Sequence, residues 1–152
     1  MKRWIKLMIL FSLMLAGCEE EKQTRIEESN NIEPPDYIQD PGDVVDIHGD
    51  ITNLEKFYTF VKHVEQGKKD KIRVVSYTTE GAPMLHDLEF NGTTIHSIND
   101  STRDGFGYGR IEEATCKGIT EVNTDGRTDY ILEDCNNPEG KDLTILVVDK
   151  KL

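Results

Sequence analysis

The chain has 152 residues, with 29 acidic and 18 basic side chains and a net charge of −11. An acidic surface repels the phosphates of nucleic acids and the anionic headgroups of lipids, so this balance argues against a nucleic-acid-binding protein. It names no partner by itself, because a high net charge also keeps a protein soluble.

An export signal is the first element that the chain predicts, over residues 1–17. Lys2, Arg3 and Lys6 give it a positive start, and residues 7–16 carry no charge. A helix that spans the hydrocarbon core of a bilayer needs about 20 apolar residues, so this run is too short to remain as a transmembrane helix. We therefore expect the secretion machinery to recognise the segment and a peptidase to remove it.

The end of that segment, Leu15-Ala16-Gly17-Cys18, resembles the lipobox of bacterial lipoproteins. The resemblance implies that the thiol of Cys18 receives a diacylglyceryl group and that the chain is cut before this residue. Two acyl chains anchor a protein stably, whereas one holds it only marginally. We thus expect a protein anchored through Cys18 to the extracytoplasmic face of the cell membrane. The alternative is an ordinary signal peptide with an incidental cysteine.

From Cys18 to Asp43 the chain is rich in acids, Asn and Pro and poor in branched apolar residues. Such a composition buries too little apolar surface to offset the conformational entropy that is lost on ordering. We expect residues 18–43 to form a flexible acidic tether between the anchor and a single folded domain, residues 44–152.

A helix is predicted between Thr52 and Gly67. Apolar residues recur there at spacings of three and four, the pattern of an amphipathic helix. They are Leu54, Phe57, Phe60, Val61 and Val64. Thr52 and Glu55 have the spacing of a capping box, and Gly67 suits the left-handed turn that closes a helix.

Strands are predicted in the rest of the domain. Residues 71–79 (KIRVVSYTT) and 143–150 (LTILVVDK) are rich in β-branched side chains. No long helical pattern lies between them. These segments predict an α+β fold in which one N-terminal amphipathic helix packs on a mainly antiparallel sheet of about five to six strands.

The dipeptide Asn91-Gly92 predicts a first hairpin, because a tight type I′ turn needs positive φ at both central residues. If these two residues form the whole loop, Asp87 faces His96 across the strands. An aspartate beside a histidine can orient a general base, so the pair is a candidate catalytic site. The alternative is a solvated pair on the outer face of the sheet.

A second hairpin is predicted at Asp125-Gly126, and its register places Cys116 opposite Cys135. Directly opposite hydrogen-bonded residues in an antiparallel pair lie about 5.5 Å apart at Cα, a separation that a disulfide tolerates. Export to an oxidising compartment would favour the bond. We therefore predict a disulfide between Cys116 and Cys135. The alternative is two reduced cysteines in the core.

Nearly all of residues 44–135 resembles a family of small lipoproteins from spore-forming Gram-positive bacteria that is known only as a domain of unknown function. The resemblance rests on the two late cysteines and on the segments GDITNLEKFYTFV, KIRVVSYTTEGAP and LEFNGTTI. It implies a fold and a location, and it implies no activity.

A glycine-rich loop is the second candidate site. Its residues are Asp104, Gly105, Gly107, Gly109 and Arg110. Such loops bind phosphate where they join a strand to the start of a helix, but no helix is predicted after this one. The loop is therefore either a ligand-contacting segment or a mobile connection between strands.

We expect no resident metal and no cofactor. The four histidines have no ligand spacing, and the acidic hairpin around Asp125 lacks the final acid of a calcium loop. The predicted function is a non-catalytic domain that binds or modulates an envelope protein or a small ligand. The alternatives are an envelope hydrolase that uses Asp87 and His96, and a small-ligand-binding or cation-binding module.

Overall fold

The structure, a computed structural model, describes residues 34–136 and 143–150. The predicted export signal, Cys18 and most of the predicted tether lie outside these residues. The described part contains the following elements in chain order: β1 (Val44–Ile47), β2 (Asp50–Thr52), α1 (Leu54–Glu65), β3 (Asp70–Tyr77), β4 (Pro83–Phe90), β5 (Ile95–Asp100), β6 (Ile111–Cys116), β7 (Gly118–Asn123), β8 (Arg127–Glu133) and β9 (Leu143–Asp149). No helix among them is both long enough and apolar enough to cross a bilayer.

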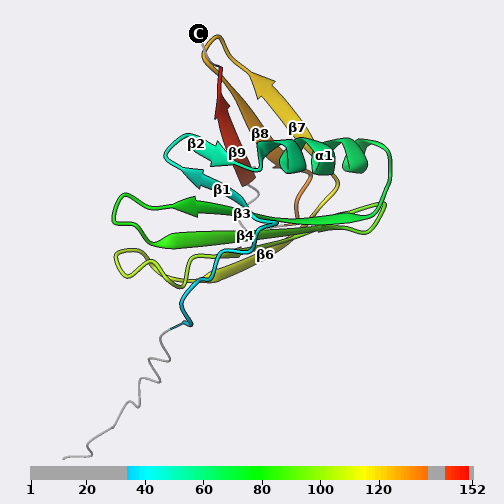
Figure 1. Cartoon of the computed structure of the whole chain (residues 1–152). Helices are drawn as coiled ribbons and strands as arrows, with labels where there is room; N and C mark the ends of the chain where they lie inside the picture. Colours follow the sequence, from blue (N-terminus) through cyan, green and yellow to red (C-terminus); the bar gives the residue numbers. More distant parts are fainter. Residues whose placement is uncertain (1–33, 137–142, 151–152) are drawn as a thin grey trace, which may run out of the picture. The chain divides into compact units, whose positions relative to one another are not determined.

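The strands form two sheets with one short helix (Figure 1). The large sheet has the order β2-β1-β3-β4-β5-β6, and the small sheet has the order β7-β8-β9. The expectation of one sheet with five to six strands was therefore wrong for the second half of the domain. The large sheet is also not wholly antiparallel, because β1 runs parallel to β3.

The β1–β2 hairpin was not predicted, although its turn has a recognisable cause. His48 and Gly49 adopt φ values of 54° and 93°, as the two central residues of a tight turn require. The carboxylate of Asp46 accepts a hydrogen bond from the Gly49 N–H at 2.7 Å. These strands have only four and three residues, which is too short for a periodic pattern to identify them.

The helix α1 corresponds to the predicted amphipathic segment, but its start differs from the prediction. Thr52 belongs to β2, and the residue before the helix is Asn53, which makes no side-chain cap. The predicted capping box is therefore wrong. At the other end, Gly67 has φ 67° as expected. The N–H groups of Gly67 and Lys68 donate to the carbonyls of Val64 and His63, which is the Schellman closure of a helix.

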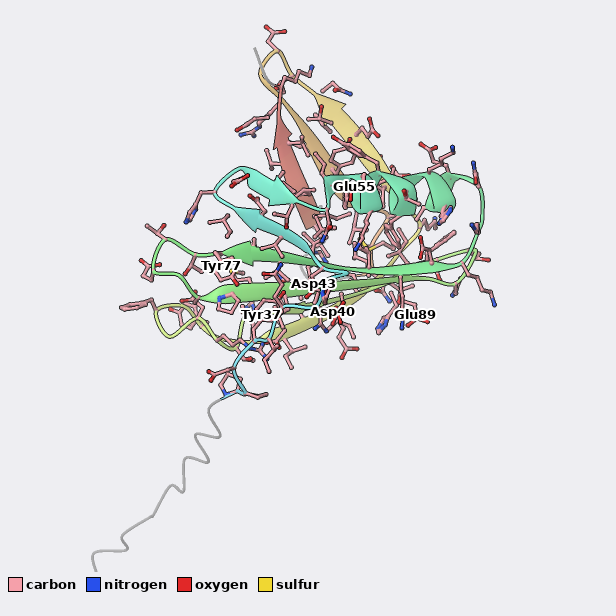
Figure 2. The ribbon with its side chains drawn as sticks, viewed as in Figure 1. Tyr37, Asp40, Asp43, Glu55, Tyr77 and Glu89 are labelled. Carbon is pink, nitrogen blue, oxygen red and sulfur yellow. A yellow bond between two sulfur atoms is a disulfide. The ribbon has the colours of Figure 1, made fainter. Side chains whose placement is uncertain are left out.

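Residues 34–43 lie against the face of the large sheet that points away from α1, which we call the outer face (Figure 2). Tyr37 packs there against a small apolar cluster whose buried members are Val45, Val75 and Leu85. Its hydroxyl donates a 2.6 Å hydrogen bond to the carboxylate of Asp43. The ordered domain therefore begins before residue 44, inside the segment predicted as a tether.

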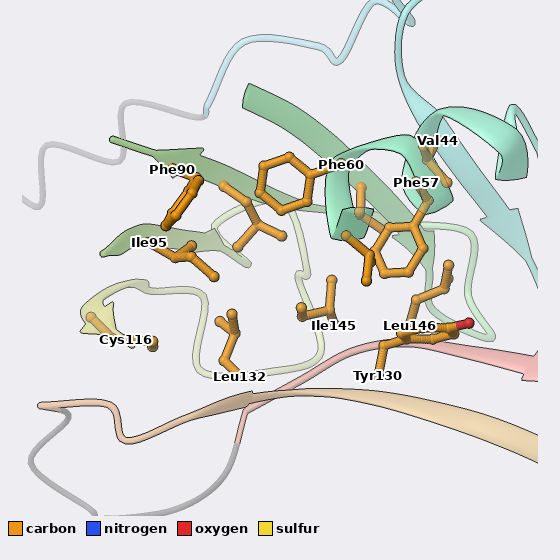
Figure 3. Packing of buried hydrophobic residues seen from close by; sticks show 14 residues of the cluster. Val44, Phe57, Phe60, Phe90, Ile95, Cys116, Tyr130, Leu132, Ile145 and Leu146 are labelled. Carbon is orange, nitrogen blue, oxygen red and sulfur yellow. The ribbon is translucent and has the colours of Figure 1, made fainter. Parts of the chain in front are cut away.

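The main core lies on the inner face of the large sheet and includes residues of both sheets (Figure 3). Phe57 and Phe60 of α1 are fully buried between them. The ring of Phe57 meets that of Tyr130, on β8, edge to face at 4.9 Å between centroids. The helix thus joins the sheets through apolar contact, the kind of contact that supplies most folding free energy.

The first predicted hairpin has a different register from the one expected. Phe90 pairs with Ile95, so Gly92 and Thr93 occupy the centre of the turn in place of Asn91 and Gly92. The Asn91 side chain accepts the N–H groups of Thr93 and Thr94 at 2.9 and 3.0 Å. Because its amide oxygen binds the turn, Asn91 closes the strand instead of entering the loop.

The second hairpin has the predicted register. Thr124 and Arg127 flank a turn made by Asp125 and Gly126, and Gly118 pairs with Glu133 at the far end. Just beyond this pair, the sulfur atoms of Cys116 and Cys135 lie at bonding distance, with 4.0 Å between their Cα atoms. The geometry thus supports the predicted disulfide. Since Cys116 ends β6 and Cys135 follows β8, the bond links the two sheets.

Candidate functional site

A groove of about 850 Å³ follows the first half of β3. The parallel strand β1 pairs only with Val74–Ser76, so in the described part of the chain residues 70–73 have no strand on this side. The groove is lined by α1, by residues 40–43 and by side chains of the outer face. Figure 2 labels Asp40, Asp43 and Glu89 beside it.

The open edge of β3 is covered in part by a carboxylate. Asp70 Oδ1 accepts the N–H of Lys71 at 2.8 Å, and Asp70 Oδ2 lies 2.6 Å from Nδ1 of His63. The other ring nitrogen of His63 accepts from Lys68 Nζ at 3.0 Å. Because both nitrogens are engaged, this ring is held in place between α1 and β3. The pair blocks the addition of another strand, a common protection of sheet edges.

An ion pair crosses the floor of the groove. Arg73 donates from Nε and Nη2 to the two carboxylate oxygens of Asp87, at 2.6 and 2.7 Å. The hydrogen bond to Asp87 outweighs the effect of burial and raises the pKa of the Arg73 guanidinium. A bidentate contact of this kind fixes both planar groups. The Asp87 carboxylate is therefore already neutralised by a cation that the sequence analysis did not consider.

The predicted catalytic pair of Asp87 and His96 is not opposed across the strands. The register places Asp87 opposite Ile98, and His96 opposite Glu89. The His96 ring instead has its Nε2 atom 3.6 Å from a carboxylate oxygen of Glu113. The error in the turn moved each partner by two positions, so both residues keep the predicted face and both line the groove. Their arrangement provides no oriented general base.

Residues 40–43 form one wall of the groove and are bound to the start of α1. Lys56 donates from Nζ to the carbonyl of Pro41 at 2.8 Å. The Asn53 side chain donates to the carbonyls of Pro41 and Asp43, at 3.2 and 2.7 Å. Asp43 is only 6% exposed and accepts hydrogen bonds from Tyr37 and from the Asp40 N–H. Burial and the bond to Asp43 raise the pKa of Tyr37.

The glycine-rich loop lies between β5 and β6, away from the groove. Asp104 accepts the N–H of Phe106 at 3.1 Å, and a Cβ atom at Gly107 would collide with the Asp104 carboxylate. Gly109 adopts a positive φ of 24°. Arg110 forms a 2.7 Å ion pair with Glu112. Asp104 therefore stabilises the loop itself, and Arg110 binds a side chain of the strand that follows it, β6.

Two features of this loop were not predicted from the sequence. Asp100, at its base, receives hydrogen bonds from Thr102 and Arg103. Burial raises the pKa of this carboxyl, but these bonds and the Arg103 charge outweigh it, so the pKa is lowered. In addition, Phe106 and Tyr108 are 85% and 98% exposed. The alternation of aromatic residues with glycines over residues 105–109 was the sequence feature that could have indicated this exposure.

A polar pair on the inner face, formed by a half-buried histidine and a buried serine, was also missed. The ring of His86 meets the hydroxyl of Ser97 at 2.8 Å, and Ser97 is 1% exposed. Burial lowers the pKa of His86 to about 4, although the charge of Asp87 opposes the shift. Because the serine hydroxyl is buried, we interpret this hydrogen bond as a structural one. The alternation along β4 could have placed His86 on the inner face.

The groove is lined by side chains of both charges. Several of them are already paired, namely Asp70 with His63 and Asp87 with Arg73. Within residues 34–136 and 143–150, no group of three or more His, Cys, Asp and Glu side chains is placed to hold a metal ion.

Comparison with known proteins gives one match. The family model for a domain of unknown function, DUF4362, matches residues 41–131, which extend from the wall of the groove into β8. No curated protein and no solved structure matches the chain. Because the matched residues make up more than half of the chain, this protein belongs to the DUF4362 family.

Proposed function

We propose that the protein is a lipoprotein anchored through Cys18 to the extracytoplasmic face of the cell membrane. The proposal is supported by the sequence Leu15-Ala16-Gly17-Cys18, which ends an uncharged run that starts at Leu7 after a basic beginning of the chain. Two acyl chains on one cysteine are sufficient for stable anchoring.

We further propose that the domain binds or modulates another component of the envelope without catalysis. The open groove along β3 is the observation that carries this proposal. Its polar lining of both signs suits a charged segment of a partner protein, because charge complementarity selects partners. The bond of Asp87 to Arg73, and its separation from His96 in the strand register, argue against the alternative of an envelope hydrolase.

A small-ligand-binding module remains the second candidate for the same groove. The groove volume of about 850 Å³ lies within the ~300–1,000 Å³ that small-molecule sites occupy. A thermal-shift screen with metal ions, sugars, peptides and nucleotides tests this candidate. A rise in melting temperature that is lost in Arg73→Ala would favour it over a protein partner.

The anchor is tested by detergent-phase partition of the wild-type protein and of Cys18→Ala, together with mass spectrometry of the N-terminus. The wild-type protein should enter the detergent phase and begin with a lipidated Cys18, whereas the variant should not be lipidated. An unmodified N-terminus in the wild-type protein would overturn the anchor.

The groove is tested by a photoreactive amino acid placed at Glu89, with Glu121 as the matched control. Both glutamates are exposed, but Glu89 lines the groove and Glu121 lies on β7 of the small sheet. Crosslinks to an envelope protein should form from position 89 and not from position 121. Turnover of any substrate that His96→Ala abolishes and His48→Ala does not would instead establish an enzyme.

A further inference from the structure

The β5–β6 loop exposes aromatic side chains and turns its polar side chains inward. Phe106 and Tyr108 are 85% and 98% exposed, whereas Phe57, Phe60 and Phe90 are at most 4% exposed. In contrast, Ser101 and Asp104 accept backbone N–H groups of the loop itself. This is the reverse of an ordinary surface loop, whose polar groups face water. The aromatic rings add nothing to the core.

The tip of the loop is also free of charge in a highly charged protein. Residues 105–109 read GFGYG, although 31% of all residues in the chain are charged. Asp104 and Arg110 flank this run. Tyr108 has the amphipathic character of side chains that occupy membrane interfaces, where the ring is in the acyl boundary and the hydroxyl is wet. Phe106 adds a purely apolar ring of the kind that interfacial segments bury.

The loop lies at the end of the domain from which the chain leads back to Cys18. Arg103 Nε donates to the carbonyl of Pro35 at 3.0 Å. Pro34 and Pro35 also line a hollow of about 650 Å³ together with Thr102 and Gly105. The 16 residues from 18 to 33 span at most about 55 Å even when fully extended. Under the proposed anchor the domain therefore stays within that distance of the membrane, and this loop lies next to Pro34 and Pro35, where the described part of the chain begins.

We propose that Phe106 and Tyr108 insert into the interface of the bilayer that holds the lipid anchor and thereby orient the domain. The proposal rests on the proposed lipid anchor. The contact is shallow, because the acidic surface of the domain resists close approach to anionic headgroups. It leaves the groove along β3 open to a partner. A protein partner for the loop is the competing explanation.

A tryptophan reporter tests this contact, because Trp4 is the only tryptophan of the chain and lies in the segment that cleavage removes. The lipidated protein is reconstituted into phosphatidylcholine vesicles, either unlabelled or brominated in the acyl chains. Phe106→Trp and Tyr108→Trp carry the reporter at the tip. Thr93→Trp is the control, since residue 93 lies in the turn at the opposite end of β5. All three proteins should sediment with the vesicles.

Emission from the two tip variants should be about twofold lower in the brominated vesicles, because an interfacial indole contacts the acyl boundary. Emission from Thr93→Trp should not change. Sedimentation without quenching at either tip position would overturn the orientation and leave the anchor standing. Failure to sediment would overturn both. Shielding of the tip reporters only after a purified envelope protein is added would assign the loop to that protein and overturn the membrane contact.

Discussion

The two faces of the large sheet differ in what they bury. On the inner face, the strands carry Val74, Leu88, Ile95 and Cys116 into a core shared with α1 and the small sheet. On the outer face, the buried apolar cluster is the small one beneath Tyr37, and most of the groove-lining side chains of this face are charged or polar. The inner face therefore supplies most of the folding free energy, while the outer face is available for binding. Four predictions test this difference.

The largest effect is expected from Phe57→Ala, which removes a fully buried ring from the inner core. The loss of transfer free energy and the cavity left behind should lower the free energy of unfolding by about 3–5 kcal/mol. Chemical denaturation measures this change. Phe106→Ala is the matched control and should alter stability by less than about 0.5 kcal/mol, because its ring is exposed. Equal effects would contradict the assignment of the core.

The link between the sheets is the next target. Replacing Cys116 and Cys135 together by Ala should lower the free energy of unfolding by about 3 kcal/mol, because the bond closes a loop between residues 19 apart. Alkylation before and after reduction, followed by intact-mass measurement, first establishes the oxidation state. Two thiols that react without reductant would refute the disulfide.

His86, the half-buried histidine on the inner face, should make the protein sensitive to acid. The pKa of His86 falls from 6.5 to about 4 on folding, so the unfolded chain binds the proton more readily. Above pH 6.5 this histidine does not reduce the free energy of unfolding. As the pH falls toward 4, proton binding to the unfolded chain lowers the free energy of unfolding by about 3 kcal/mol. Urea denaturation across this range should show a weaker pH dependence for His86→Gln than for wild type. His96→Gln, which retains His86, should keep the wild-type dependence.

The smallest of the four effects is expected on the outer face. Tyr37→Phe removes the hydroxyl that donates to the buried Asp43 carboxylate and should cost about 1–2 kcal/mol. Hydrogen exchange should rise in residues 34–43 while the inner core stays protected. Tyr108→Phe is the control, since that hydroxyl is on an exposed residue. A cooperative loss of protection throughout the domain would show that the two faces are not separable.

The two hairpins show which local signals were sufficient. Asp125 and Gly126 occupy the centre of their turn as expected, although neither adopts the positive φ of a type I′ turn. The pairing of Ile119 with Leu132 follows from the position of that turn alone. At Asn91-Gly92 the same signal misled, because Asn91 binds the amides of Thr93 and Thr94. Local competition between a side chain and the backbone shifted the register.

The candidate site was predicted in part. Alternation along the strands placed Asp87 and His96 on one face, and the structure keeps them there. The partner of Asp87 is Arg73, on a strand that is adjacent in the sheet but not in the predicted hairpin. The pattern of one hairpin does not show which strand lies on its other side. The ion pair could therefore be predicted only with knowledge of the strand order in the sheet.

The sequence by itself determined the amphipathic helix, its closure at Gly67, the β7–β8 register and the proximity of Cys116 and Cys135. These features depend on short-range geometry, in which each residue restricts its near neighbours. Only the tertiary structure decided the parallel pairing of β1 with β3, the division into two sheets and the docking of Tyr37 on the outer face. Such contacts join distant residues, and they form where the total burial of apolar surface is greatest, which no local pattern specifies.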